Sequence, residues 1–307
     1  MKVKCKCGNE SVIERKYEGT SLCKQCFLKS VERKIKKTIR KDRLIDPKDK
    51  IAVALSGGKD SFLALYVLDQ IIKPRKDIKL IAITVDPGIK GFSKPIQKAK
   101  KFCKELGIRH YVFSYSKIFK RNLEEQIKGM KRINPETTKE DICSACSVAR
   151  RWVLNKEARK LGVTKICTGH NLDDEIQSVF MNYVRGDLMR AVRMSPEPIK
   201  HHKLFIPRIK PLREIPEEES ALFAKLKSFD ADRKKCPFRS GIRFEIGGFL
   251  DKFEEKHPGM KFSVLETFDK FRPFMVDAIK DSSKIITCKK CKEPSSRELC
   301  NTCELWK

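Results

Sequence analysis

Two kinds of segment in this sequence of 307 residues have the residue types for chemistry: one glycine-rich turn and several sets of cysteines. The turn has the letters SGGKDS and directly follows the apolar run Ile51–Leu55. Its glycines let the backbone approach a phosphate closely, and the helix that follows offers free N–H groups and a positive dipole end. The spacing is not that of a Walker loop. We predict a phosphate-binding turn made by Ser56, Gly57, Gly58, Lys59 and Ser61.

Two later segments are expected at the same site, because a ligand of an open α/β sheet lies at the carboxyl ends of the strands. One is Val85–Asp86, whose backbone groups could contact a base. The other is Thr168–Asp174, where a glycine permits close approach to a phosphate or a ribose. Within it, Asp173 and Asp174 offer the oxygen ligands that Mg²⁺ prefers. His170 fits either a structural cap or a ligand contact.

Three internal cysteines form a second candidate site: the C-x-x-C pair Cys143 and Cys146, and the later Cys236. Three thiols of this kind suit a redox dithiol, a persulfide carrier, an iron–sulfur cluster with one open iron, or zinc with an open position. An ordinary buried thiol is the alternative for Cys236. Basic neighbours are expected to lower the pKa values of these thiols; they are Arg150, Arg151, Lys234 and Lys235.

Eight of the thirteen cysteines fall in two terminal sets of four. The N-terminal set is Cys5, Cys7, Cys23 and Cys26, and the C-terminal set is Cys288, Cys291, Cys300 and Cys303. The C-terminal set pairs two C-x-x-C knuckles, and the N-terminal set pairs a C-x-C with a C-x-x-C. Four thiolates in such pairs suit tetrahedral zinc, and lobes this small need a metal to fold. We predict one structural zinc in each lobe. The remaining Cys103 and Cys167 fall inside a helix and a strand and are predicted to pack in the core.

Alternating apolar segments indicate the elements that position these groups. Buried strands are predicted at residues 51–55, 80–85, 109–113 and 163–168, and helices at 62–68, 94–106 and 146–161. Strands that alternate with helices in this way form a parallel, doubly wound α/β sheet. The first strand ends at the glycine-rich turn, and the third helix directly follows the C-x-x-C pair.

The flanking regions have a different pattern. A basic helix with an apolar stripe is predicted at residues 29–43, and a new helix starts at Pro216. A helical extension is expected to bury Phe244, Phe249, Phe253, Phe262, Phe268, Phe271 and Phe274 as core aromatics. The predicted organisation is an N-terminal zinc finger at 1–30, a basic linker helix at 31–46, a catalytic domain at 47–239, a helical extension at 240–285 and a C-terminal zinc finger at 286–307.

Composition restricts the classes of protein. The net charge of +28 favours a polyanionic partner, and nucleic acid is the commonest one. The longest apolar run, Phe62–Leu68, is far shorter than the ~20 residues of a membrane-spanning helix. No membrane association is therefore predicted. Reduced thiols and the absence of an apolar signal segment predict a cytoplasmic location.

The SGGKDS turn after its apolar strand resembles the PP-loop of the ATP pyrophosphatase superfamily. The chain also contains, in this order, the segments CSACSVARR, TGHNLDD and KKCPF. Together they resemble the tRNA 2-thiolation enzymes, and the two terminal cysteine lobes narrow the resemblance to the tRNA 2-thiouridine synthetases of archaea, some thermophilic bacteria and the eukaryotic cytosol. The resemblance covers essentially the whole chain. One departure is the single residue between Cys5 and Cys7, where the family usually has two.

The resemblance implies a PP-loop fold, ATP with Mg²⁺, and a 4Fe–4S cluster held by Cys143, Cys146 and Cys236, with one iron free to carry sulfur. It also implies an ATP site lined by Ala54, Leu55, Ser56, Lys59, Val85, Arg150 and Gly169. Lys59, Asp60 and the three cysteines would be the catalytic residues. The implied reaction is adenylation of the C2 oxygen of a tRNA uridine, at the wobble or T-loop position, and its replacement by sulfur.

Several alternatives stay open. A PP-loop thiolase could use a persulfide on Cys146 or Cys236 without a cluster. A non-catalytic zinc-ribbon RNA-binding protein would not need the intact SGGKDS turn, and a PP-loop amidotransferase would need a glutaminase segment. The expected partners are tRNA and a sulfur donor, which could be a ubiquitin-like thiocarboxylate protein, a persulfide or sulfide. Homodimers are common in the family.

Overall fold

The computed structural model describes the 307-residue chain except residues 1–3, 92, 200–201, 232–235, 279–284 and 307. Its centre is a five-stranded sheet of order β5-β4-β3-β6-β7 in which every neighbouring pair is parallel. The strands are β3 (Lys50–Ala54), β4 (Lys79–Asp86), β5 (Arg109–Ser114), β6 (Lys165–Cys167) and β7 (Arg208–Ile209). The doubly wound α/β fold and its four expected strands are confirmed. β7 is not predicted, because its two residues are too few to show a pattern.

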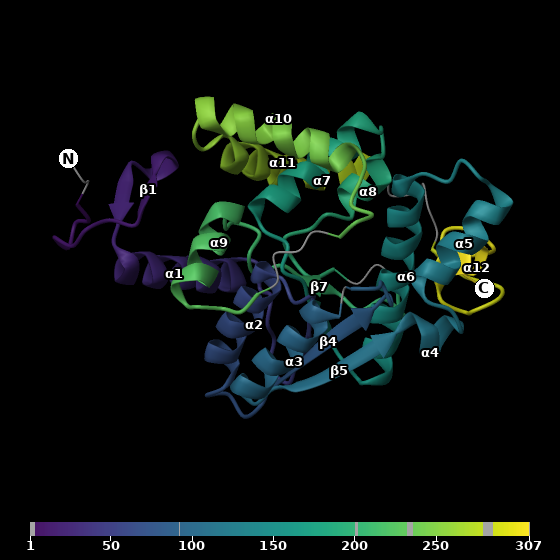
Figure 1. The fold of residues 1–307 in the computed structure, drawn as a ribbon. Coiled ribbons are helices and arrows are strands. Elements are labelled where there is room, and N and C mark those ends of the chain that lie inside the picture. Colours follow the sequence, from purple (N-terminus) through teal and green to yellow (C-terminus); the bar gives the residue numbers. More distant parts are fainter. Residues whose placement is uncertain (1–3, 92, 200–201, 232–235, 279–284, 307) are drawn as a thin grey trace.

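Helices cover both faces of this sheet (Figure 1). On one face lie α2 and α3, and α9 packs against α2 and α1 in the same apolar core. On the opposite face α6 packs against β4, and its apolar side chains join those of β3 and β4. These helices are α1 (Lys24–Lys41), α2 (Lys59–Ile72), α3 (Lys94–Leu106), α6 (Lys139–Lys160) and α9 (Glu217–Leu226). Cys103 and Cys167 are buried in the core, as predicted.

The start of α6 differs from the prediction. The helix begins at Lys139 rather than at Cys146, because a capping box precedes the cysteines. The Thr138 hydroxyl accepts a hydrogen bond from the Asp141 N–H at 3.2 Å, and an Asp141 carboxylate oxygen accepts one from the Thr138 N–H at 2.9 Å. Cys143 and Cys146 therefore lie inside the helix, three residues apart and on one face.

The N-terminal lobe is attached through a buried ionic contact. It consists of β1 (Ile13–Arg15), the short 3₁₀ helix η1 (Lys16–Glu18) and β2 (Thr20–Leu22), followed by α1. The Arg15 guanidinium donates to Glu219 of α9 at 2.6 Å, and the Tyr17 hydroxyl donates to the other oxygen of the same carboxylate. Arg15 is 2% exposed and Glu219 is fully buried, so neither charge has water as an alternative partner.

Replacing Glu219 with Ala is expected to lower the free energy of unfolding by about 3 kcal/mol, because it removes the only fully buried carboxylate partner of the Arg15 guanidinium and leaves it the half-exposed Glu18. The exposed neighbour Glu218 provides the matched control, and Glu218→Ala should change the free energy by less than about 0.5 kcal/mol. Denaturant unfolding of both variants measures the difference. Equal stabilities of the two variants would contradict the proposed attachment.

The C-terminal helices pack on α7 (Leu172–Val184) and α8 (Leu188–Val192). α10 (Ile242–Lys256) and α11 (Met260–Ala278) bury one face through Leu250, Leu265 and Phe268. The prediction of seven core aromatics is wrong for four of them, because they lie on the outward faces of α10 and α11. Their exposed fractions are 56% for Phe249, 41% for Phe253, 60% for Phe271 and 71% for Phe274.

The remaining elements lie at the end of the molecule opposite the N-terminal lobe (Figure 1). They are α4 (Tyr115–Phe119), α5 (Leu123–Ile133), β8 (Ile286–Thr287), β9 (Pro294–Ser295) and α12 (Asn301–Trp306). The last three form the C-terminal cysteine lobe, and α12 lies against α6. None of the described helices is long and apolar enough to span a bilayer.

Candidate active site

The glycine-rich turn links β3 to α2, and two glycines leave no room for a side chain: Gly57 within the turn and Gly169 in the segment after β6. Gly57 has φ +84°, and a Cβ atom there would lie 2.4 Å from the carbonyl oxygen of Pro95. A Cβ atom on Gly169, after β6, would lie 2.8 Å from the backbone of Asp60. Two segments that the sequence places at different strand ends are thus in contact at one edge of the sheet.

Side chains within the turn hold its shape. The Ser61 hydroxyl donates to the carbonyl of Gly58 at 2.8 Å and accepts from the N–H of Ser56 at 3.3 Å. Gly58 precedes α2 in an extended conformation, so the first N–H groups of the helix lack helical partners. These free N–H groups could bind an anion, and phosphate binding by the turn stays a prediction.

Two carboxylates surround Lys59. Its ammonium lies 2.8 Å from Asp60 and 2.9 Å from Glu217 at the start of α9. Burial alone would lower the pKa of Lys59, but the two carboxylates outweigh burial and raise it, so the ammonium stays charged at neutral pH. Burial also raises the pKa of Asp60, although Lys59 and the Asn171 side chain oppose this rise. Glu217 is absent from the predicted site, because it lies far from Lys59 in the sequence.

A cavity of about 340 Å³ joins the turn to the internal cysteines. Its lining includes Asp60 from the turn, all three cysteines, and basic side chains from three segments. The cysteines are Cys143, Cys146 and Cys236, and the basic residues are Arg150, Arg239 and Arg243. The tertiary structure thus places a nucleotide-type turn and a thiol set on one cavity.

The sulfurs of Cys143, Cys146 and Cys236 do not all lie within 4.8 Å of one another. In the described part of the chain, only the two terminal sets have ligand sulfurs that all lie within 4.8 Å of one another. Four thiolates on one zinc stand about 3.8 Å apart, which follows from the tetrahedral angle and a Zn–S bond of about 2.3 Å. A cluster whose irons each take one thiolate suits a wider set of ligands. The donor set of this cavity therefore fits a polynuclear cluster better than a mononuclear site.

The electrostatic setting of Cys143 differs from the expectation that neighbouring bases would lower its pKa. Burial raises the pKa of Cys143, the nearby thiols Cys146 and Cys236 raise it further, and Arg150 opposes this only weakly. A guanidinium N–H of Arg150 donates to the Cys146 sulfur at 3.5 Å. The predicted basic neighbours Lys234 and Lys235 lie outside the described residues.

The acidic pair at the start of α7 is divided between two environments. Asp173 accepts from the backbone N–H of Glu217 at 2.6 Å and from the buried ammonium of Lys261. Asp174 lines the cavity and pairs with Arg243 at 3.1 Å. A magnesium ion held by both carboxylates is therefore not supported by the geometry.

The other predicted residues occupy the strand ends. The His170 ring shares a hydrogen bond of 3.0 Å with the Thr168 hydroxyl. Burial, and to a smaller extent the charge of nearby Lys210, lowers the pKa of His170 to about 4. The ring is therefore neutral at pH 7. Leu55 is buried, and its carbonyl accepts from the Thr84 hydroxyl at 2.6 Å. Ala54 and Val85 are half-buried at the carboxyl ends of β3 and β4. Their contacts with ATP stay predictions.

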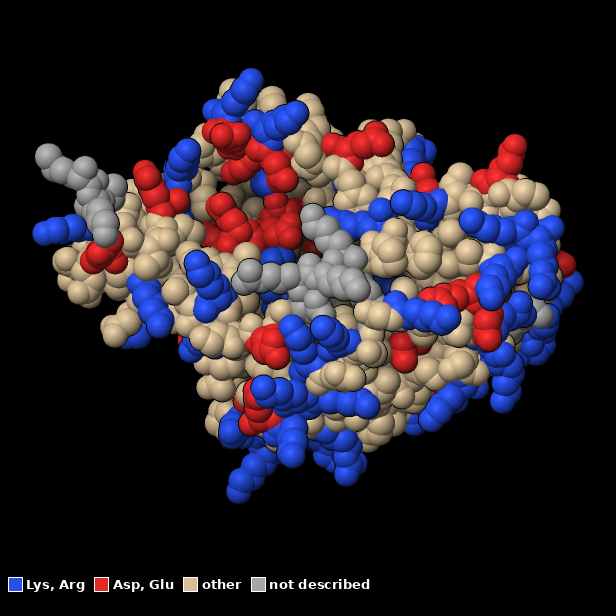
Figure 2. Space-filling model, in the orientation of Figure 1, with Lys and Arg blue, Asp and Glu red and all other residues tan. Residues whose placement is uncertain are grey.

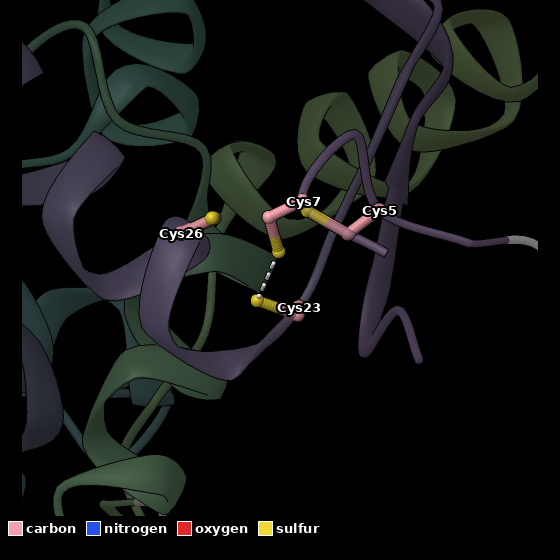
Figure 3. Close-up of side chains that lie close together, drawn as sticks. All are labelled: Cys5, Cys7, Cys23 and Cys26. Atoms are coloured by element: carbon pink, nitrogen blue, oxygen red, sulfur yellow. Dashed lines mark hydrogen bonds between the residues drawn. The ribbon is translucent and has the colours of Figure 1, made fainter. Parts of the chain in front are cut away.

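The four N-terminal cysteines converge on one point (Figure 3). All four sulfurs lie within 4.8 Å of one another, and those of Cys7 and Cys23 are 3.5 Å apart. The short Cys5–Cys7 spacing is accommodated by a tight turn, in which the Gly8 N–H donates to the Cys5 carbonyl at 2.8 Å. The donor set fits tetrahedral zinc.

The C-terminal cysteines form a second tetrahedral donor set. Sulfur–sulfur distances are 3.8 Å for Cys288 and Cys303 and 3.6 Å for Cys291 and Cys300. Burial alone would raise the pKa of Cys288, but backbone N–H groups, including that of Cys300 at 3.3 Å from its sulfur, lower this pKa to about 6. The thiolate form that zinc requires is thus favoured at Cys288.

Basic and acidic side chains are separated on the surface (Figure 2). Lys and Arg gather over the end of the molecule that holds α4, α5 and α12, and along the edge near α2 and α3. Asp and Glu gather around α9 and α10. On the face shown, the positive charge is therefore concentrated over these elements.

The chain matches two protein families and is similar to several known proteins. The PP-loop domain family matches residues 27–230, and the family described as 2-thiouridine synthetase TtuA, N-terminal LIM domain, matches residues 4–28. A probable sulfurtransferase of Methanocaldococcus jannaschii is 37% identical over 97% of this chain and 86% of its own length.

Two further relatives carry more specific names. The tRNA-5-methyluridine(54) 2-sulfurtransferase of Pyrococcus horikoshii is 31% identical over 99% of this chain and 94% of its own length. The solved structure of the U34-tRNA thiolase NcsA from Methanococcus maripaludis, with its [4Fe-4S] cluster, superposes with a TM-score of 0.83 at 33% identity. The match covers 98% of this chain and 95% of that structure.

Proposed function

The chain belongs to the PP-loop tRNA 2-thiouridine synthetases, and from this premise we propose that it activates the C2 oxygen of a tRNA uridine with ATP and replaces that oxygen with sulfur. The observation that carries this proposal is the single cavity shared by the phosphate turn and three cysteines. Activation and sulfur transfer can then follow at one bound uridine, which does not have to leave between the two steps.

In the first step the uridine oxygen attacks the α-phosphorus of ATP, an oxygen–phosphorus bond forms, and pyrophosphate leaves. The N–H groups at the start of α2 and the Lys59 ammonium would stabilise the charge on the departing phosphates. Lys59 must exchange its contact with Glu217 for one with phosphate. Mg²⁺, when bound with ATP, would neutralise part of the same charge.

In the second step sulfur attacks C2, the bond from C2 to the activated oxygen breaks, and AMP leaves. The cysteines would hold a 4Fe–4S cluster, which when bound supplies an open iron for the incoming sulfur. The cluster named for the Methanococcus maripaludis relative supports this choice over a persulfide without a cluster. Arg150, with one N–H on the Cys146 sulfur, would stabilise the ligating thiolate.

The terminal lobes would each hold one structural zinc, because each presents four thiols in a tetrahedral arrangement with no open position. The substrate would be tRNA, in keeping with the basic surfaces and with the names of the relatives. The sulfur donor would be sulfide, a persulfide or a thiocarboxylate protein, and a homodimer stays a prediction.

The test is a reaction of the anaerobically purified protein with tRNA, ATP and sulfide. We expect 2-thiouridine in the digested tRNA by mass spectrometry, with one AMP and one pyrophosphate per sulfur introduced. Mapping of the modified fragment decides between the wobble and T-loop positions. Formation of ADP instead of AMP, or tRNA without sulfur, would exclude the proposed reaction.

Binding of tRNA is expected to weaken steeply with salt, by about 10³–10⁵ between 50 and 200 mM for ~6–10 phosphate contacts. α1 carries exposed Lys36 and Lys37 and packs on α9 beside the cavity, whereas Lys34 is held by Glu18. Reversing the two exposed charges, Lys36→Glu with Lys37→Glu, should reduce the slope of log affinity against log salt by about one per lost contact.

A comparison variant reverses two other exposed lysines, Lys73 and Lys76, which follow the end of α2. Filter binding or fluorescence anisotropy across a salt series measures both double variants. If Lys36→Glu with Lys37→Glu keeps the slope of the unmodified chain, α1 does not contact the tRNA backbone, and its basic side chains face only solvent.

A further inference from the structure

The C-terminal cysteine lobe packs against α6 through α12 (Figure 1). The contact lies at the helical turn that carries Cys146. Trp306, at the end of α12, is 1% exposed, and its indole N–H donates to the backbone carbonyl of Ala145 at 3.0 Å. The Gln126 side chain donates to the carbonyl of Leu305. The lobe therefore contacts the residue that directly precedes a predicted cluster ligand.

Tyr115 links the lobe to the same turn. Its ring is fully buried and meets the Trp306 ring edge-on, with centroids 4.8 Å apart and planes at 73°. Its hydroxyl donates to the backbone carbonyl of Cys146 at 2.8 Å and lies 3.7 Å from the Cys146 sulfur. Burial, followed by the nearby Cys146, raises the pKa of Tyr115, so the hydroxyl keeps its proton.

These contacts are unusual for the interior of a helix. A carbonyl inside a helix already accepts a hydrogen bond from the N–H four residues later. Two successive carbonyls of α6 each accept a second hydrogen bond from an aromatic side chain: that of Ala145 from the indole N–H and that of Cys146 from the tyrosine hydroxyl. Both donors belong to buried aromatic side chains, so no water can replace either hydrogen bond. The position of this helical turn is therefore determined by two residues distant in sequence.

We propose that Tyr115 and Trp306 are positioning residues that hold the Cys146 sulfur toward the cavity and couple the C-terminal lobe to the active site. The role of Cys146 as a cluster ligand rests on the proposed function, whereas the contacts that position it do not. A ligand needs a fixed direction relative to Cys143 and Cys236, and residues that orient ligands typically change metal affinity or activity by about 10–100-fold when they are removed.

The direct test uses the full chain without iron and measures the alkylation rates of Cys143 and Cys146 by peptide mass spectrometry. Tyr115→Phe keeps the ring and removes only the hydroxyl, and Trp306→Phe removes the indole N–H. We expect Cys146, which is 7% exposed, to react about 3–10-fold faster in both variants, because one buried hydrogen bond no longer restrains its turn. Cys143, whose backbone receives neither bond, should keep its rate.

The comparison of the two cysteines separates positioning from general loosening, because a destabilised fold would speed both reactions. Tyr111→Phe, on the half-buried strand β5, removes a tyrosine hydroxyl elsewhere and should change neither rate. Trp306→Phe could unfold the C-terminal lobe, which would be seen as loss of zinc. In that case the alkylation rate of Cys146 in Tyr115→Phe alone tests the proposal. An unchanged Cys146 rate in Tyr115→Phe would overturn the proposal.

A second measurement uses the reconstituted protein. Loss of a donor near a ligating sulfur should lower the reduction potential of a cluster and speed loss of iron to a chelator by about 10-fold. If the unmodified chain assembles no cluster, the proposed function fails while the alkylation result still stands. If the cluster assembles and both variants match the unmodified chain in both measurements, the positioning role is wrong.

Discussion

Replacement of any one of Cys143, Cys146 and Cys236 with Ser is expected to abolish tRNA thiolation and to remove iron from an anaerobic preparation. All three side chains line one cavity, and each would hold a different iron of the proposed cluster. The broad visible absorbance should bleach, and iron should fall from ~four per chain. Zinc should stay near two per chain, because each terminal lobe has its own four thiols.

Ser147→Ala provides the control for this series, because Ser147 lines the same cavity and follows Cys146 without being a sulfur ligand. That variant should keep its iron, its absorbance and most of its activity. Metal analysis, visible spectra and a thiolation assay on the four variants give the answer. An anaerobic protein that is colourless, iron-free and still thiolates tRNA would overturn the cluster and favour the persulfide alternative.

Replacement of Lys59 with Ala is expected to lower the rate of adenylation by about 10²–10³-fold, as typically follows the loss of one preorganised group that stabilises developing charge. The raised pKa of Lys59 keeps its ammonium charged throughout the neutral range, so the whole charge is lost in the variant. The side chain is 25% exposed at the first residue of α2, so the fold should survive. Release of AMP in single-turnover reactions measures this step.

Glu217→Gln gives the complementary test, because it keeps Lys59 and removes one of the two carboxylates that hold it. With less competition for the ammonium, this variant should bind ATP more tightly than the unmodified chain. Tighter binding in Glu217→Gln together with lost adenylation in Lys59→Ala assigns the lysine to the phosphates. Full thiolation by Lys59→Ala would contradict the phosphate-binding role of the turn.

The features that the sequence predicts correctly are those with local causes. The apolar run and the SGGKDS turn that follows it show in neighbouring residues where a strand ends and a helix begins, although the strand itself forms by pairing with β4 and β6. The helix at residues 94–106 has its predicted bounds, because Gly107 adopts φ +71° and ends it within one turn. The spacing of the terminal cysteines similarly predicts two four-thiol groups, since short chain segments bring those thiols together.

The contacts that join these features come from packing between distant segments, and no local pattern reveals them. Examples are the pair of Lys59 with Glu217, the division of Asp173 from Asp174, and the four outward-facing phenylalanines of α10 and α11. The bond from Trp306 to the helix of Cys146 joins the end of the chain to its middle. Residue types and spacing determined which chemistry this protein carries. Only the tertiary structure decided which groups share a cavity, because that depends on how whole elements pack.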